Sequence, residues 1–515
     1  MSQLFRRKPI SELRDDHVDP QTGVEHGLRR SLGVWQLTAL GIGAIVGAGI
    51  FSGAGTAVSG GPNHLGAGPG LVVSYVLVAI ACGFAALCYA EFASLIPQAG
   101  SAYTYAYATL GEVVAWIIGW DLIIEYAVGN IAVAVSWSAY FVTLLEGFGI
   151  RLPAWMATDP RTAHQGFEAL QAAAPGTADS ALTAAAQAWQ TAPHPFGFPL
   201  IFNLPAVLIV ALITWILVIG IRESAWANTV MVILKLGILF FFIAIGSFWV
   251  KPANWHPFMP NGWQGVFSGA ALIFFAYIGF DAVSTAAEEA RDPQRDMPRA
   301  MIMSLAVTSV IYIVVTLVMT GLVPWNAHGS ADPLAAAFTE RGYDWAAGII
   351  SFGAIIAMAS VLLVFQMGQP RIFYSMARDG LLPPFAAKLH PKFRTPHVTT
   401  MLTGAFVAFF AAFANINEVI ELTNIGTLFA FVLVAIGVLA LRLRDPGRHR
   451  PFRTPAVWFV APAAVVSCGF LMYQLPAVTW MRFGIWLAVG LVIYFLYGYR
   501  RSALNHPAPP VPPVS

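Results

Sequence analysis

The chain has 515 residues, of which 57% are hydrophobic and only 10% are charged, and its net charge is +2. Soluble domains carry about 25% charged residues, so this composition argues against an ordinary soluble enzyme and indicates a polytopic membrane protein. The low net charge, without a basic domain or a recognition motif, argues against a nucleic-acid partner. The three cysteines lie in apolar runs without a CxxC spacing, so we expect no disulfide framework, metal site or cofactor.

The first apolar run, Val34–Val58, is long enough to cross a bilayer, yet its centre reads GIGAIVGAGIF. Glycine weakens a helix and lets backbone approach backbone or ligand closely. Lipid cannot satisfy the N–H and C=O groups of an unwound helix, so a break survives only where it lines a cavity or meets a ligand. The run therefore predicts a helix break that binds a solute. The alternative is helix packing alone, because Gly43 and Gly47 have the small-xxx-small spacing.

Apolar runs of membrane length recur about twelve times along the chain. We therefore predict an all-α polytopic membrane protein with about 12 transmembrane helices. The predicted spans are Val34–Val58, Pro69–Ile96, Glu112–Leu145, Pro199–Ile219, Asn228–Val250, Gly265–Glu288, Arg299–Val323, Trp345–Met376, His397–Ala414, Glu418–Leu441, Pro455–Met472 and Phe483–Tyr499.

Lysines and arginines are distributed unevenly between the two sides of these spans. If the N-terminus lies in the cytosol, 22 of them fall on the cytosolic side and five on the other. Cytosolic loops carry the excess of Lys and Arg in membrane proteins, so we predict that both termini are cytosolic. The longest connection, 146–198, is then external. Its Ala-rich interior lacks an apolar stripe and predicts a loosely helical surface insertion, with a lid as the alternative.

A second interrupted span is the sixth, where Gly279 breaks the run and Asp281 follows within the membrane. Paired interruptions at corresponding positions of two halves indicate an inverted-repeat transporter with its site at the midplane. The predicted organisation is a cytosolic tail (1–31), a first repeat of five spans (32–255), a second repeat (256–443), two additional helices (444–499) and a Pro-rich cytosolic tail (500–515).

Few charged side chains fall inside the predicted spans. Lys235 lies about two turns into the fifth span, where an ionisable residue is costly and usually functional. A desolvated lysine can gain and lose a proton during a cycle, whereas the alternative is snorkelling to the surface. Asp121 and Glu125 share a face of the third span, and we favour ion pairs near the membrane surface over titration. Glu421, at an external edge, is expected to be solvated, as is Glu418.

Six stretches resemble the cationic-amino-acid-transporter branch of the amino acid–polyamine–organocation superfamily, and the resemblance runs from about Leu32 to Tyr499. They are GIGAIVGAGIF (41–51), YAEFASLIPQAGSAYTYAY (89–107), GWDLIIEYA (119–127), FFAYIGFDAVSTAAEEARDPQRDMP (274–298), RIFYSMARDGLLP (371–383) and ELTNIGTLFAFVLVAIGVL (421–439). The resemblance implies the leucine-transporter fold, with broken helices 1 and 6. It also implies import of amino acids by alternating access, with the protein located in a cell membrane such as the bacterial inner membrane.

The resemblance also implies a substrate site made of backbone. The N–H groups of Gly47, Ala48 and Gly49 would bind the substrate carboxylate at a half-helix N-terminus. The carbonyls that would accept from the α-ammonium belong to Ile45, Phe275, Ala276 and Ile278. In proton-coupled members a lysine on the fifth helix occupies the place of a sodium ion. Lys235 matches it, facing the carbonyls of Gly43 and Val46, which favours protons over sodium.

Specificity follows from the eighth span, which reads GAIIAMASVLLVF and has no carboxylate. Met358 would fill the pocket there, so we expect small neutral amino acids to be preferred over cationic ones. Asp121, Glu125 and Asp281 are candidate gating or secondary titratable groups. The expected partners are an amino acid, protons and the lipid bilayer, with a homodimer or a small accessory helix left open. An amino acid/polyamine exchanger is the main alternative function, followed by a membrane nutrient sensor; no enzymatic activity is expected.

Overall fold

The computed structural model describes residues 3–8, 32–61, 64–96, 101–172, 180–219, 225–327, 329–330, 332–393 and 395–504. Helices dominate this part of the chain, and its strands are limited to a short antiparallel hairpin, β1 (Gly60–Gly61) and β2 (His64–Leu65). In chain order the long helical elements are α2 (Val34–Ile45), α3 (Ala54–Ser59), α4 (Leu71–Leu95), α5 (Ser101–Thr109), α6 (Glu112–Ile123), α7 (Gly129–Gly147), α8 (Pro160–Ala172), α9 (Ser180–Thr191), α10 (Leu204–Ile219), α11 (Ala225–Ser247), α12 (Gly262–Ile273), α13 (Pro293–Leu322), α14 (Pro333–Thr339), α15 (Asp344–Arg378), α16 (His397–Phe413), α17 (Ile416–Arg444), α18 (Val457–Tyr473) and α19 (Ala477–Ile493).

Short 3-10 and π-helical turns join or extend these helices. They include η1 (Gln3–Phe5), η2 (Gly49–Gly53), η4 (Ile124–Val128), η8 (Phe274–Tyr277), η9 (Asp281–Glu289) and η12 (Tyr494–Gly498), and the chain's last described helix is α20 (Tyr499–Arg501).

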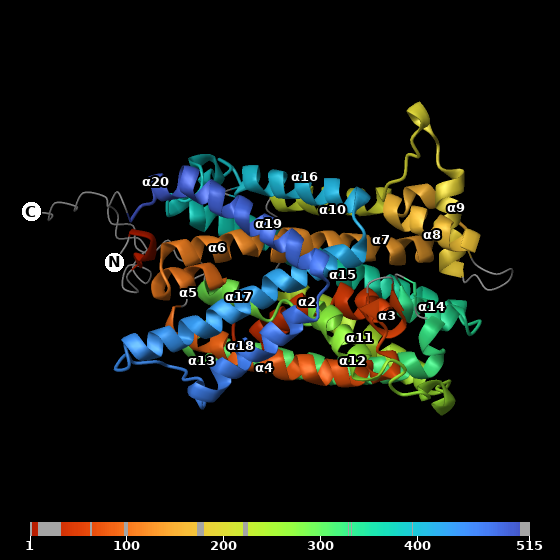
Figure 1. Cartoon of the computed structure of the whole chain (residues 1–515), viewed down its shortest axis with the longest axis horizontal. Coiled ribbons are helices and arrows are strands. Elements are labelled where there is room, and N and C mark those ends of the chain that lie inside the picture. The colour runs from red at the N-terminus through yellow and green to blue at the C-terminus, as the bar shows by residue number, and fades with distance from the viewer. Residues whose placement is uncertain are drawn as a thin grey trace, which may run out of the picture.

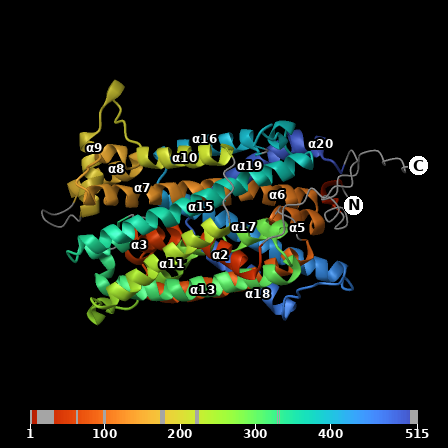
Figure 2. The same ribbon diagram turned by 180° about the vertical axis from the view of Figure 1, so that it is seen from behind.

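Nine helical segments of the described chain are long and apolar enough to cross a membrane, and three shorter apolar helices, α10, α16 and α18, accompany them. Together they match the twelve predicted runs and confirm the all-α polytopic class. The two spans with predicted breaks are the most buried, since 89% of the most apolar stretch of each lies inside the protein. Both views of the bundle show α2 and α3 in its middle, between α4 and α13 on one side and α6 and α7 on the other (Figures 1 and 2).

The first span is interrupted where the glycines predict it. Helix α2 ends at Ile45, Val46 leaves the helical region at φ −76° and ψ 99°, and the wide turn η2 restarts the helix that continues into α3. The sixth span is interrupted too, because Ile278 is extended and Gly279 has φ 120°, a conformation that favours glycine. Both predicted breaks are therefore present, whereas the inverted relation of the halves 32–255 and 256–443 stays a prediction.

The two breaks touch each other backbone to backbone. A Cβ atom added to Gly49 would lie 2.2 Å from the Cα atom of Ala276, and one added to Gly279 would lie 2.9 Å from the carbonyl carbon of Ala44. Contacts this close leave no room for any side chain. The glycines therefore allow close packing as well as the helix break. The two interpretations of the glycine-rich motif, a helix break and helix packing, are both correct.

The two ends of the bundle differ in what they carry. Turn η1 and helix α20 lie at one end, here called the tail end, and Arg6 donates a 3.1 Å hydrogen bond to the Leu504 carbonyl there. Helices α8, α9 and α14 lie at the other end, here called the insertion end (Figures 1 and 2). The shared tail end agrees with an even number of spans between the termini.

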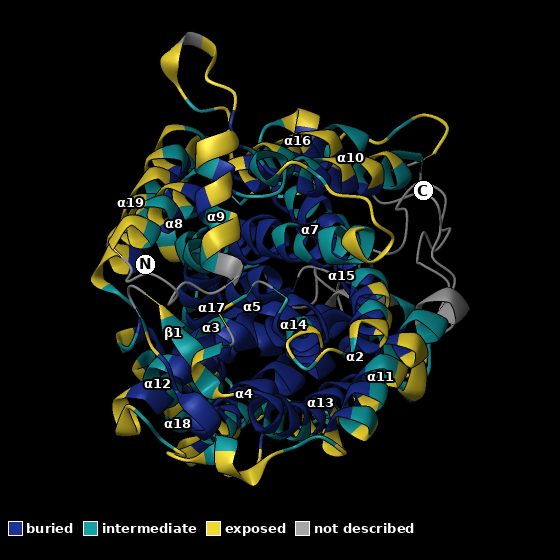
Figure 3. Ribbon diagram, turned by 90° about the vertical axis from the view of Figure 1, so that its right-hand side faces the viewer, coloured by how far each residue is buried: buried dark blue, intermediate teal, exposed yellow. Residues whose placement is uncertain are grey.

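The insertion is helical, as predicted, but the prediction that it lacks an apolar stripe is wrong. Alanines of α8 and α9 pack face to face in a small apolar cluster of their own; its members are Ala163, Ala188, Ala192 and Ile201, covered by Ala154, Trp155 and Trp189. The insertion also docks on the bundle, since Arg161 pairs with Glu418 and Asn415 donates a 2.9 Å hydrogen bond to Thr162. Its outer faces are exposed (Figure 3).

Because the two breaks are in contact, a methyl group added at Gly49 should destabilise the protein, whereas one added at a glycine with open space around it should not. Gly49→Ala should lower the thermal midpoint of the purified protein strongly, because overpacking typically costs about 1–3 kcal/mol and the clashing atoms here are backbone. Gly83→Ala is the matched control, since its Cβ would meet nothing within 4 Å and alanine favours helix. Equal midpoints for both variants would contradict the contact.

Candidate functional site

The first break presents buried hydrogen-bond donors. The Gly47 carbonyl accepts from the N–H groups of Ile50 and Phe51 at 3.2 Å each, which starts the new helix. No backbone carbonyl of the described chain accepts from the N–H groups of Gly47 or Ala48. Both residues are buried, and a helix N-terminus carries a partial positive charge. These donors give the first break a positive potential that suits a carboxylate.

Backbone acceptors lie next to these donors. The carbonyl of Ile45 accepts a 3.0 Å hydrogen bond from the hydroxyl of Tyr312, and that of Phe275 accepts a long one, 3.4 Å, from Ile278 N–H. A carbonyl oxygen has two lone pairs, so each keeps capacity for an ammonium group. Since Gly49 and Ala276 are in contact, donors and acceptors share one buried centre. A small zwitterion matches such a pair of opposite backbone poles.

Lys235, on α11, is fully buried and faces the first break. Its ammonium donates to the carbonyls of Gly43 at 2.7 Å and Val46 at 3.2 Å, and to the hydroxyl of Ser360 at 2.7 Å. The two carbonyl partners are those that the family resemblance implies, and snorkelling to the surface does not occur. The lysine thus ties α11 and α15 to the end of α2.

Helix α15 supplies the side chains beside the first break. Val361 lies against Gly47, where an added Cβ would come within 2.8 Å of its methyl group, and Ser360 accepts from Lys235. Met358 is fully buried and lies one turn before Val361 on the same helix face. No carboxylate lies between Asp344 and Asp379 on this helix. The wall beside the break is therefore apolar, as the sequence predicts.

Three carboxyl groups are buried together on the tail side of the breaks. Asp121, Glu125 and Asp281 are each at most 2% exposed. Both oxygens of Asp121 and of Asp281 lack a hydrogen-bond partner in the described chain, and Asp281 interacts with Glu125. The prediction that Asp121 and Glu125 form surface ion pairs is therefore wrong. Two adjacent buried carboxylates repel each other, and a proton on one of them relieves the repulsion, so this cluster has the chemistry of a proton acceptor.

Several functional contacts were not anticipated from the sequence. Ser360 and Tyr312 are polar residues in apolar helices, and nothing in the sequence next to them indicates their partners. In the structure Ser360 accepts from Lys235, and Tyr312 donates to the Ile45 carbonyl. Glu421 was expected to be solvated, yet it is 4% exposed and binds His64 at 2.7 Å and the hydroxyl of Thr479. Glu418 is partly exposed, in agreement with its predicted solvation, and it pairs with Arg161 and Arg482.

Helix α14 lies over the first break at the insertion end, where it contacts η2 and α3, and it is in the middle of the view in Figure 3. It is attached to α7, because Thr143 donates a 2.6 Å hydrogen bond to the carboxyl group of Asp332 at its start. Burial raises the pKa of Asp332 to about 6, although the bond from Thr143 acts in the opposite direction. The attachment of this cover therefore involves a carboxyl group whose pKa in the folded protein is about 6.

Comparison with known proteins identifies the family. The family model described as "Amino acid permease" matches residues 32–496. A branched-chain amino acid permease of Bacillus subtilis is 45% identical over 98% of this chain and 99% of its own length. A methylthioribose transporter of the same organism is 43% identical over 98% and 100%, and a vacuolar cationic amino acid transporter 4 of Arabidopsis thaliana is 33% identical over 87% and 68%. All are named as permeases or transporters, not as enzymes.

The environment of Asp332 predicts a pH-dependent stability. Its folded pKa of about 6 exceeds the ordinary 3.8, so its contribution is complete below about pH 4 and is lost as pH rises through 6. The loss amounts to about 2–3 kcal/mol at most. Thermal midpoints measured from pH 4 to pH 7 should fall more for wild type than for Asp332→Asn. The exposed Asp344→Asn is the control and should keep the wild-type slope.

Proposed function

Because the chain belongs to the amino acid permease family, we propose that it imports L-amino acids across the cell membrane by alternating access, coupled to protons. The observation that carries the proposal is the pair of contacting helix breaks, which buries donors at Gly47 and Ala48 beside the carbonyls of Ile45 and Phe275. Every amino acid has a carboxylate and an ammonium one carbon apart. A site made of backbone poles recognises this common part and leaves selection to side chains.

Lys235 supports coupling to protons rather than to sodium. Its ammonium occupies the position from which a cation would contact the carbonyls of Gly43 and Val46, and a second cation there would be repelled. Hydrogen bonds from a charged donor are roughly twice as strong as neutral ones. Loss of the proton would therefore loosen the end of α2 from α11, which links protonation to the position of the first break.

The orientation follows from the charges at the tail end. The predicted cytosolic side holds 22 of the lysines and arginines, among them Arg6, Arg7 and Lys8 next to η1, and Arg500 and Arg501 in α20. We therefore place the tail end in the cytosol and the insertion end outside. The acidic cluster of Asp121, Glu125 and Asp281 then lies on the cytosolic side of the breaks and is a second candidate for the coupling proton.

Substrate preference depends on the side chains beside the first break. The apolar wall of α15, with Met358 and Val361, favours neutral amino acids over cationic ones. The relatives differ in their named substrates, from branched-chain amino acids to cationic amino acids and methylthioribose. The unpaired carboxyl groups of the acidic cluster are the feature that would suit a cationic side chain instead.

Coupling is tested with labelled alanine and an imposed inward proton gradient in proteoliposomes. Wild type and Lys251→Ala, an exposed lysine, should accumulate alanine, whereas Lys235→Ala should lose accumulation. Exchange of internal for external alanine without a gradient shows whether the variant is folded and should persist. Accumulation in Lys235→Ala equal to wild type would move the proton to the acidic cluster, and a requirement for sodium or for internal substrate would favour a sodium symporter or an exchanger.

Specificity is tested by competition against alanine uptake. In wild type, leucine should compete better than arginine. Met358→Ser enlarges and polarises the wall, so we expect arginine competition to increase several-fold, as one removed methylene is worth about 1–3 kcal/mol in a pocket. Met472→Ser, a buried methionine on α18, is the control and should keep the wild-type order. Unchanged arginine competition in Met358→Ser would remove Met358 from the pocket.

A further inference from the structure

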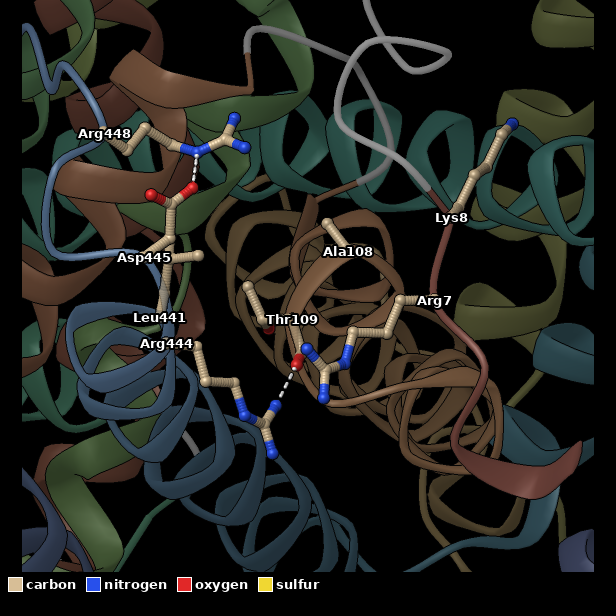
Figure 4. Close-up of a pocket in the computed structure, with 8 residues that line it drawn as sticks. All are labelled: Arg7, Lys8, Ala108, Thr109, Leu441, Arg444, Asp445 and Arg448. Atoms are coloured by element: carbon tan, nitrogen blue, oxygen red, sulfur yellow. Dashed lines mark hydrogen bonds and ion pairs between the residues drawn. The ribbon is translucent and has the colours of Figure 1, made fainter. Parts of the chain in front are cut away.

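A basic pocket lies at the tail end, outside the substrate site. Its volume is about 310 Å³, and it is formed where the N-terminal segment crosses the end of α5 and the end of α17 (Figure 4). The residues that line it are Arg7, Lys8, Ala108, Thr109, Leu441, Arg444, Asp445 and Arg448. Four of these eight are basic and one is acidic, so the charges around the pocket do not balance.

Two of the four cations are already neutralised by carboxylates. Arg448 binds Asp445 at 2.6 Å, and Lys8 binds Asp379 at 3.3 Å, its ammonium pointing away from the other side chains in Figure 4. Asp445 is the sole acidic residue of the pocket lining, and it is occupied by Arg448. Arg7 and Arg444 are therefore left facing each other over the pocket without a carboxylate between them.

The guanidinium group of Arg7 is incompletely satisfied. Its Nε atom is buried and has no hydrogen-bond partner in the described chain, whereas Arg444 donates a 2.9 Å bond to the Thr109 carbonyl. Burial and, to a smaller extent, the charge of Arg444 lower the pKa of Arg7. Other arginines of this end differ, since Arg442 and Arg450 both pair with Glu91, at 2.8 Å and 3.1 Å.

We propose that the Arg7–Arg444 pocket binds a phosphate group. The planar fork of a guanidinium matches the oxygens of phosphate, and two such groups converging on one cavity bind it from both sides. The volume accommodates a phosphate with a short ester substituent. That chemistry is shared by the head group of an anionic phospholipid in the cytosolic leaflet and by a soluble phosphate ester.

A phosphate there would join the N-terminal segment to the end of α17. The same helix holds Asn424, whose side chain donates to the carbonyls of Ala271 and Leu272 at 2.7 Å and 3.0 Å, directly before the second break. A phosphate bound between Arg7 and Arg444 would offset the repulsion of the two guanidinium groups and hold the end of α17 against the N-terminal segment. The pocket is thus placed to affect how easily the second break moves, independently of which amino acid is carried.

Binding is tested on the purified full-length protein in a neutral detergent. Inorganic phosphate, added at constant ionic strength with chloride as the comparison, should raise the thermal midpoint of wild type. In Arg7→Gln the apparent affinity should fall about tenfold or more, since a charge-assisted hydrogen bond is lost. Arg444→Lys keeps the charge but not the fork and should fall as well. Arg453→Gln, an exposed arginine of the same end outside the pocket, should behave as wild type.

A second arm compares nanodiscs of phosphatidylglycerol with nanodiscs of phosphatidylcholine for the same variants. Stabilisation by inorganic phosphate assigns a soluble source, and stabilisation by phosphatidylglycerol alone assigns a lipid head group, provided that either is lost in Arg7→Gln. Stabilisation in neither arm overturns the proposal. So does an equal loss in Arg453→Gln, which would reflect the general charge of this end. Substrate transport does not enter either measurement.

Discussion

The structure depends on one constraint, which is that backbone polar groups cannot remain unpaired next to lipid. Two helices break in the middle of the bundle, and the cost is tolerable only because the breaks meet each other in the interior. The close approach of Gly49 to Ala276 and of Gly279 to Ala44 buries both unwound segments against protein. Around them α4, α11, α13, α15 and α17 provide the shielding that lipid would not. The candidate site thus lies where the two helices are interrupted and leave backbone groups without helical hydrogen bonds.

The backbone site that we propose has a further result for the charged residues. A zwitterion is neutral overall, so such a site needs no charged side chain for it, and the buried ammonium of Lys235 is bound by the carbonyls of Gly43 and Val46 instead. Lys235 stabilises the end of α2 by filling an acceptor pair that would otherwise face an apolar helix. The carboxyl groups of Asp121, Glu125 and Asp281 lie apart from it, and no ion pair joins them to a basic side chain of the described residues. Charge inside the bundle is therefore divided between two separate groups.

The sequence predicts the parts of this arrangement that arise from local chemistry. Membrane spans follow from apolar length, the breaks follow from glycines within them, and Lys235 is conspicuous because lysine is rare in an apolar helix. Contacts between distant segments leave no local signal. Ser360 looks like any small residue of a membrane helix, and Glu421 lies close to a predicted span edge, so neither its burial nor its bond to His64 can be read from spacing. The apolar cluster of α8 and α9 was missed because alanine is small enough to pack without forming a marked stripe.

The shortness of α16 has a consequence for the surrounding membrane. This helix contains 17 residues, which at 1.5 Å per residue span about 25 Å, less than the roughly 30 Å of a typical hydrocarbon core. Its outer face carries exposed apolar side chains such as Phe409 and Phe413, which suit contact with acyl chains. Hydrophobic mismatch on this flank favours a bilayer that is thinner beside α16 than around the longer helices.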